Sequence, residues 1–230
     1  MTVKARQIVE QADVIMHDTV VSKEILALAG RAKLDDAELR GYANRAHQKE
    51  LAQRLAAYVN PDAIVCRLKS GDPFMFGNGA ETLHYLHELG IEVEIVPGIS
   101  SGLGAASRAG VALTHGATNA TLCMVGGYRG QSERLNYKAL ASMGTVVLYM
   151  ALGLIGEHVR SLLQAGMAPD KSACIIERGT HADERVFYCT LAEIENVVKA
   201  NGVSEPAIVI LGGQAAVERA LMVDVPESQA

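Results

Sequence analysis

The sequence predicts an α/β protein of two domains. Short apolar runs rich in β-branched residues alternate with segments whose apolar side chains recur at helical spacing, which is typical of parallel sheets. The polar, turn-rich segment LTHGATN at 113–119 places a domain boundary there, between a first domain at 1–113 and a second at 114–230. The chain has 230 residues, 49% hydrophobic and 20% charged, so it can bury a sizeable core.

In the first domain, helical spacing, caps and turn signals separate the elements. Ser22 is a candidate N-cap and Gly30 a candidate helix end, and Asn-Pro-Asp at 60–62 marks a turn before a β-branched run. We predict helices at 5–12, 22–28, 48–59 and 80–89, and strands at 13–16, 63–68 and 91–96.

The second domain continues the alternation with more strands. The segment GTHADE leaves only a short connection between two of them, so we expect these two strands to pair in antiparallel fashion. We predict strands at 121–125, 145–149, 173–177, 185–189 and 207–211, and helices at 133–142, 153–165, 191–200 and 213–221.

Charge and hydropathy exclude several classes of protein. The formal net charge is −5 and there is no long basic block, so we expect no nucleic-acid partner. The longest apolar stretch, at 145–155, is too short to cross a bilayer, and the N-terminus has no apolar core of a signal peptide. We therefore expect a cytoplasmic protein without a membrane partner. No Rossmann fingerprint, P-loop or nucleophile elbow occurs in the sequence.

The cysteines and histidines indicate no metal centre. Cys66, Cys123, Cys174 and Cys189 show no C-x-x-C spacing, and the first three lie in apolar runs, so we interpret them as buried reduced thiols. His84 and His87 are three residues apart on a predicted helix, but the sequence offers no third ligand. We expect no metal.

The strongest candidate for a ligand-binding segment is KSGDPFMFGNGAE at 69–81. It leaves the carboxyl end of a predicted strand, where open α/β sheets bind their ligands. Its three glycines would let a ligand approach the backbone closely. A plain turn uses glycine and proline too, but it seldom needs so many over this length.

Four further candidates follow strands. Asp18 is well placed for a general base, or it is a solvated loop acid. Ser100 and Ser101 in VPGISS either contact a ligand or cap the small-residue helix after them. Met150 is the last residue of TVVLYM, and it either contacts a cofactor or fills the core. Gly179 lies in a turn after a strand.

Six segments in order resemble the tetrapyrrole methylases, and within them the uroporphyrinogen-III C-methyltransferases. They are KSGDPFMFGNGAE, VPGISS, AGVALTH, VVLYM, ERGTHADERV and PAIVILG. The resemblance implies two α/β domains with the active site in the cleft between them, and a homodimer. It implies S-adenosylmethionine as cofactor, S-adenosylhomocysteine as product, and a tetrapyrrole substrate. Uroporphyrinogen III would be methylated at C2 and C7 to precorrin-2, on the route to sirohaem and cobalamin.

The resemblance also implies roles for particular residues. Asp18 matches the family's proposed proton acceptor, and Arg40 is the nearest match to its proton-donor lysine, although arginine cannot release a proton at neutral pH. The positions that match cofactor-binding residues are Ser70, Gly71, Asp72, Met75, Ser100, Ser101, Met150 and Gly179. Candidate cations for the substrate's carboxylates are Arg40, Arg45, Lys49, Arg108 and Arg129.

The sequence departs from the family at its start. The family opens with a strand and a G-x-G-P-G-D loop before the first helix, and this sequence has neither, so we expect exposed strand edges beside their place. Three interpretations stay open. The chain is an active uroporphyrinogen methyltransferase, a catalytically silent or truncated dimeric relative, or a precorrin methylase that acts later.

Overall fold

The computed structural model describes residues 1–37, 45–117, 119–130 and 134–213, in two compact units, Met1–Ser100 and Ser101–Ala230. The boundary lies earlier than the one predicted after residue 113. Helix α5 (Ser101–Arg108) belongs to the second unit because the Gly102 N–H donates to the Tyr149 hydroxyl at 2.9 Å. Just beyond the helix, the Tyr188 hydroxyl donates to the Ala109 carbonyl at 2.9 Å.

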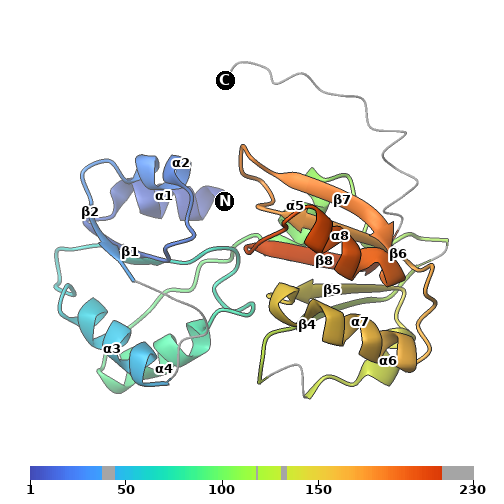
Figure 1. Ribbon diagram of the computed structural model, residues 1–230. Coiled ribbons are helices and arrows are strands. Elements are labelled where there is room, and N and C mark those ends of the chain that lie inside the picture. The colour runs from blue at the N-terminus through green and yellow to red at the C-terminus, as the bar shows by residue number, and fades with distance from the viewer. Residues whose placement is uncertain (38–44, 118, 131–133, 214–230) are drawn as a thin grey trace. The chain divides into compact units, whose positions relative to one another are not determined.

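The first unit is a three-stranded parallel sheet with helices on both faces (Figure 1). The strand order is β2-β1-β3, and β1 lies in the centre. The strands are β1 (Val14–His17), β2 (Lys33–Asp36) and β3 (Val65–Leu68). The helices are α1 (Val3–Gln11), α2 (Lys23–Leu26) with the 3-10 turn η1 (Ala27–Ala29), α3 (Arg45–Ala56) and α4 (Gly79–Glu88).

Strand β1 divides the core of this unit into two halves, because successive side chains of a strand point to opposite faces. Ile15 packs with Val9 of α1 and with Ala29. Met16 packs on the other face, against side chains of α3 and α4 that include Leu51 and Leu86. Burial of both faces explains the uninterrupted apolar run at Val14–Met16.

Two expectations for this unit are wrong. Strand β2 was not predicted, because Lys33–Asp36 is a mostly exposed edge strand with three charged residues and no apolar run. Conversely, no strand forms at 91–96, where Val93 and Ile95 are exposed. An extended segment becomes a strand only when it pairs, and in the part of the chain described here no strand lies on the outer edge of β3.

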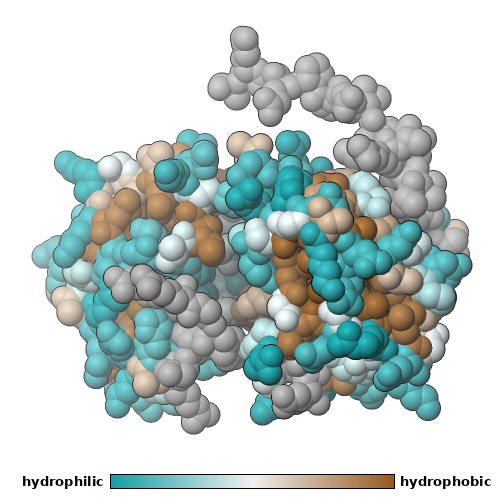
Figure 2. Space-filling view, in the orientation of Figure 1, coloured by the Kyte–Doolittle hydropathy of each residue, from teal (hydrophilic) through white to brown (hydrophobic). Residues whose placement is uncertain are grey.

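Exposed apolar side chains concentrate in the first unit. Of thirteen large hydrophobic residues that are exposed among the described residues, twelve lie in residues 1–100. Figure 2 shows patches of apolar surface among hydrophilic residues on the face of this unit turned to the viewer. These side chains leave apolar surface of the first unit exposed.

The second unit is a five-stranded mixed sheet of order β4-β5-β8-β6-β7, in which β4 and β5 are parallel and every other pair is antiparallel. The predicted antiparallel pairing is confirmed, with Ser172 opposite Thr190 and Glu177 opposite Arg185. The strands are β4 (Leu122–Gly126), β5 (Thr145–Tyr149), β6 (Ser172–Glu177), β7 (Arg185–Thr190) and β8 (Ala207–Gly212).

Helices cover both faces of this sheet. Val146 and Leu148 of β5 pack with side chains of α6, α7 and α8 in one large apolar cluster, and α5 lies on the opposite face beside Tyr149. The remaining helical segments are α6 (Tyr137–Ala141), η3 (Leu152–Leu154), α7 (Ile155–Gln164), η4 (Leu191–Glu193) and α8 (Ile194–Ala200). The helix predicted at 213–221 lies outside the described residues, apart from residue 213.

Candidate active site

Asp18 lies at the carboxyl end of the central strand β1 and is only 7% exposed. Its N–H donates to the Leu68 carbonyl at 3.0 Å, at the end of the neighbouring strand β3. One carboxylate oxygen, Oδ1, accepts a hydrogen bond from the Arg67 guanidinium. The other, Oδ2, accepts one from the Ser70 N–H at 3.3 Å. Asp18 is therefore a fixed, nearly buried carboxylate beside the glycine-rich loop and not a solvated loop acid.

Arg67 and Lys69 both lie beside this carboxylate. The sequence analysis named neither as a site residue, although Lys69 begins the loop segment that it selected. Arg67 Nη1 also donates to the Met16 and Leu68 carbonyls, at 3.3 and 3.0 Å. The Lys69 ammonium lies 3.7 Å from Asp18 Oδ2, with its side chain only 9% exposed. Arg67 lies in the half-buried strand β3, where a charged group needs a partner of opposite charge, but the sequence does not identify that partner. Burial lowers the pKa of Lys69, Arg67 adds to this, and Asp18 and Glu81 oppose it.

The two loops predicted in the first unit lie against each other. Asp72 Oδ1 accepts from the Phe74 N–H at 3.0 Å, and Oδ2 accepts from the Gly98 N–H at 3.1 Å. A Cβ on Gly98 would lie 2.0 Å from the Gly71 carbonyl oxygen, so only glycine allows this contact. Asp72 thus joins the GDPF loop to VPGISS, and both of its oxygens bond to the protein's own backbone.

The side chains around these loops differ in exposure. Ser70 and Met75 are exposed, Met75 by 39%, while Ser100 is 5% exposed. The loop offers backbone groups and a thioether, and its lysine, Lys69, faces Asp18.

The candidates of the second unit gather at one edge of its sheet. Strands β5 and β6 are both antiparallel to β8, so their carboxyl ends lie at the same edge. Ser101 begins α5, which is held at Tyr149 directly before Met150. Gly179 follows β6, and a Cβ there would lie 2.5 Å from the Ala105 Cβ of α5. Gly179 is therefore required for close packing and is not a simple turn residue.

Left-handed backbone marks the same segments. Five non-glycine residues among those described have positive φ angles: Phe76, Asn78, Met150, Arg178 and Thr180. Two lie in the glycine-rich loop, one is the candidate methionine, and two flank Gly179. Such conformations cost about 1–3 kcal/mol each and cluster at functional sites. All five fall in segments that the sequence analysis had selected.

Arg40 lies outside the described residues, so the structure places nothing at this predicted position. Of the candidate cations for substrate carboxylates, Lys49, Arg108 and Arg129 are exposed. They lie on or next to different elements, with Lys49 on α3, Arg108 at the end of α5 and Arg129 after β4.

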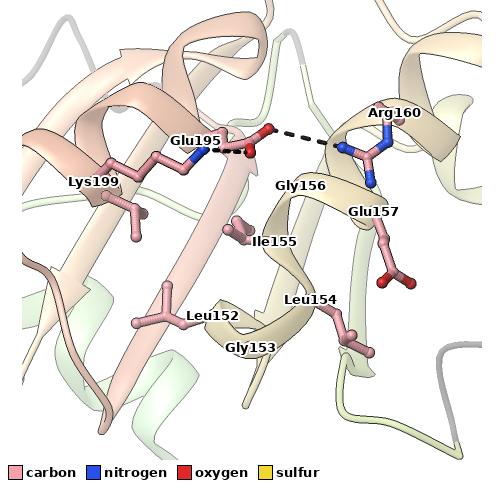
Figure 3. A pocket seen from close by; sticks show the side chains of 10 residues that line it. Leu152, Gly153, Leu154, Ile155, Gly156, Glu157, Arg160, Glu195 and Lys199 are labelled. Carbon is pink, nitrogen blue, oxygen red and sulfur yellow. Dashed lines mark hydrogen bonds and ion pairs between the residues drawn. The ribbon is translucent and has the colours of Figure 1, made fainter.

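A separate open pocket lies between the start of α7 and helix α8 (Figure 3). Glu195 projects between Arg160 and Lys199, at 3.9 and 3.0 Å, and with Glu157 it balances the two cations that line this pocket. None of the predicted site residues lines it. We therefore do not assign the candidate site to this pocket.

The four cysteines are free thiols, and three of them have a raised pKa because of burial. The pKa is about 11 for Cys66 and Cys189 and about 12 for Cys174. Within the described ranges there is no group of three histidine, cysteine or acidic side chains able to hold a metal ion. Over the same residues, no helix has the length and hydropathy needed to cross a membrane.

Comparison with known sequences supports the resemblance. A family model described as Tetrapyrrole (Corrin/Porphyrin) Methylases matches residues 1–195. An S-adenosyl-L-methionine-dependent uroporphyrinogen III methyltransferase of Methanosarcina barkeri is 34% identical, over 92% of this chain and 85% of the relative. A uroporphyrinogen-III C-methyltransferase of Synechocystis is 35% identical, over 92% and 82%.

Solved structures agree with these sequences. A uroporphyrin-III C-methyltransferase of Thermus thermophilus, in complex with S-adenosylhomocysteine, has a TM-score of 0.77 and 30% identity, over 92% of this chain and 90% of that one. A cobalt precorrin-4 methyltransferase shares the fold, with a TM-score of 0.81 at 24% identity. The two-domain α/β architecture and the family predicted from six short segments are thus confirmed. The chain belongs to the tetrapyrrole (corrin/porphyrin) methylases.

Proposed function

We propose that this chain transfers methyl groups from S-adenosylmethionine to C2 and C7 of uroporphyrinogen III, giving precorrin-2 and S-adenosylhomocysteine. The observation that carries the proposal is the concentration of left-handed backbone and tightly packed glycines in the GDPF loop, at Met150 and around Gly179. The reaction named for the relatives from Methanosarcina barkeri and Synechocystis supports the choice of substrate.

We assign cofactor binding to the loops at the carboxyl ends of the strands in each unit. Bound S-adenosylmethionine supplies a methyl group on a sulfonium sulfur, so the protein's main task is to hold that carbon in line with the nucleophile and to exclude water. Glycines allow the backbone to approach the cofactor, and the exposed thioether of Met75 supplies apolar contact. The proposed binding residues are Ser70, Gly71, Asp72, Met75, Ser100, Ser101, Met150 and Gly179.

Asp18 is the proposed proton acceptor. Bound S-adenosylmethionine would give its methyl group to a ring carbon of the substrate, and its carbon–sulfur bond would break with the electron pair kept by sulfur. The methylated ring then loses a proton, and Asp18 Oδ2 accepts it. Arg67 holds the other oxygen, so the carboxylate is oriented before the substrate arrives. We assign no proton transfer to Arg40, because a guanidinium keeps its proton at neutral pH.

The substrate carries eight carboxylates, so exposed cations are needed to bind it. We propose that Lys49, Arg108 and Arg129, which are exposed, contribute to this binding. The exposed apolar side chains of residues 1–100 support a homodimer. We also expect the protein to act in the cytoplasm.

The test is transfer of labelled methyl from S-adenosylmethionine to anaerobically prepared uroporphyrinogen III. We expect label in a dimethylated tetrapyrrole, identified by mass. Asp18→Asn should lower the rate about 100-fold, the range of a lost general base. Asp62→Asn is the matched control, since Asp62 is exposed on a turn.

Calorimetry with S-adenosylhomocysteine separates the remaining alternatives. Suppose the chain binds this product and methylates precorrin-2 or a later intermediate, but not uroporphyrinogen III. The substrate is then that later intermediate, and the proposed substrate is wrong. A folded sample that binds no S-adenosylhomocysteine and transfers no label would identify a silent relative.

A further inference from the structure

The carboxylate of Asp18 faces two cations where one would neutralise it. Arg67 satisfies Oδ1 and is itself fixed by the carbonyls of Met16 and Leu68. The Lys69 ammonium approaches Oδ2, the oxygen proposed to accept the proton, at 3.7 Å. Removing two cations from water carries a large desolvation cost. Because of this cost, we expect the Lys69 ammonium to have a function beside Asp18 Oδ2.

Lys69 also lies directly beneath the glycine-rich loop. A Cβ on Gly77 would be 3.3 Å from Lys69 Cε and 3.5 Å from Lys69 Nζ. The same ammonium group thus contacts the carboxylate on one side and is in reach of the loop on the other.

Of the two cations beside Asp18, only lysine can lose its proton in an accessible pH range. The titratable and charged groups that face Lys69 are Asp18 after β1, Arg67 on β3 and Glu81 on α4. Burial is the largest influence and lowers the pKa of Lys69. The positive charge at Oδ2 is therefore lost at a lower pH than that of an exposed lysine.

We propose that Lys69 is a positioning residue whose ammonium couples the Asp18 carboxylate to the glycine-rich cofactor loop, and that loss of its proton uncouples the two. This rests on the proposed function of Asp18 and of the loop. While charged, Lys69 attracts Oδ2 and holds it in place. When Lys69 is neutral, it no longer attracts Oδ2. Asp18 and the glycine-rich loop then lose the charged group that both of them contact.

The first test measures the coupling without any catalysis. In the full chain labelled with carbon-13 at lysine Cε, the Lys69 resonance should titrate at lower pH than the resonances of exposed lysines. Asp18→Asn should move the Lys69 midpoint further down, because it removes a carboxylate that favours the ammonium. A Lys69 resonance that titrates with those of the exposed lysines, or one unmoved by Asp18→Asn, would overturn the coupling.

The second test uses the methyl-transfer rate as a function of pH. Wild type should lose activity on the alkaline side as Lys69 deprotonates. Lys69→Arg keeps the charge and should move that alkaline loss to higher pH, while Lys69→Gln should lower kcat about 100-fold across the range. Lys138→Gln, at an exposed position of α6, is the control and should leave the alkaline limb unchanged.

The two tests fail in distinguishable ways. Absence of methyl transfer by wild type refutes the proposed function, and the titration still decides whether Asp18 and Lys69 are coupled. If Lys69→Arg and wild type lose activity at the same alkaline pH, the role of Lys69 is refuted while the proposed function stands. Circular dichroism of each variant checks that it is folded, and the wild-type titration needs no variant.

Discussion

Asp72 Oδ2 accepts a hydrogen bond from the Gly98 N–H at 3.1 Å, and this contact joins two loops from distant parts of the sequence. The second oxygen accepts from the Phe74 N–H at 3.0 Å and shapes the loop that carries Asp72 itself. One carboxylate therefore sets the relative position of GDPF and VPGISS. The resemblance assigned Asp72 to the cofactor, whereas its contacts show that it also organises the loops proposed to bind it.

Asp72→Ala removes both hydrogen bonds, so we expect it to weaken S-adenosylhomocysteine binding at least about tenfold and to cost about 1–3 kcal/mol of folding free energy. Calorimetry and urea unfolding measure the two effects. Asp72→Asn keeps one acceptor oxygen and should lie between Asp72→Ala and wild type. Asp62→Ala, on an exposed turn, should change neither quantity. Unchanged affinity in Asp72→Ala would show that the loops keep their position without this carboxylate.

Local patterns in the sequence predicted much of the fold. The apolar runs of β5, β6 and β8 are buried on both faces, so their composition alone identifies them. Strand β2 was not predicted, because its charged residues form an edge strand only through pairing with β1. The extended segment at 91–96 was misread for the converse reason, since its composition favours a strand but no described neighbour pairs with it.

The candidate site was predictable to a similar degree. Glycine and proline at strand ends located the loops, because close approach and unusual φ angles leave a compositional trace. The environment of Asp18 left no such trace. Its burial, its bond to Arg67 and the approach of Lys69 depend on which strands are neighbours, and that order is a property of the folded sheet.

Gly102 lies where a side chain would collide with Tyr149. A Cβ there would be 2.2 Å from the Tyr149 hydroxyl oxygen, whose hydrogen bond holds the start of α5. Gly102→Ala should therefore lower the free energy of unfolding by about 1–3 kcal/mol, as overpacking does. Removing the hydroxyl with Tyr149→Phe in the same chain should recover part of this loss. Gly153→Ala is the control, since nothing lies within 4 Å of a Cβ there.

Thermal or urea unfolding of the four proteins tests this prediction as a double-mutant cycle. The expected result is a favourable coupling between Gly102→Ala and Tyr149→Phe. Additive losses would mean that α5 moves as a whole to accept the methyl group. In that case affinity for S-adenosylhomocysteine should fall in Gly102→Ala with or without the hydroxyl, because Ser101 moves with the helix.

Glu177 gives the second unit a pH-dependent stability. Its carboxylate is 1% exposed, and the hydrogen bond from Arg185, with others from Ser204, lowers its pKa to about 2 from 4.5. A lowered pKa means that the folded state favours the ionised form. The stabilisation is therefore complete above about pH 4.5 and is lost as the pH falls toward 2.

Glu177→Gln should remove this part of the pH dependence and cost stability at neutral pH, since it leaves the Arg185 charge without its partner. Urea unfolding between about pH 2 and pH 7 measures both effects, with Glu50→Gln on the exposed face of α3 as the control. Equal slopes of stability against pH in wild type and Glu177→Gln would contradict the assignment.

Two glycines of the cofactor loop should respond very differently to the same substitution. A Cβ on Gly79 would lie 2.0 Å from the Pro73 carbonyl oxygen, which is backbone and cannot move without reshaping the loop. A Cβ on Gly77 would meet the flexible end of Lys69 at 3.3 Å, which a small side-chain shift relieves. Gly79→Ala should weaken S-adenosylhomocysteine binding at least about tenfold, and Gly77→Ala only about twofold.

Gly77→Ala has a second, specific consequence. Because its methyl group displaces the end of Lys69, it should shift the Lys69 titration, while Gly79→Ala should leave that resonance near its wild-type midpoint. Calorimetry together with the lysine titration therefore separates the shape of the loop from its coupling to Asp18. If Gly77→Ala left the titration unchanged and Gly79→Ala moved it, the ammonium would be supported by the loop backbone as a whole and not by its contact at Gly77.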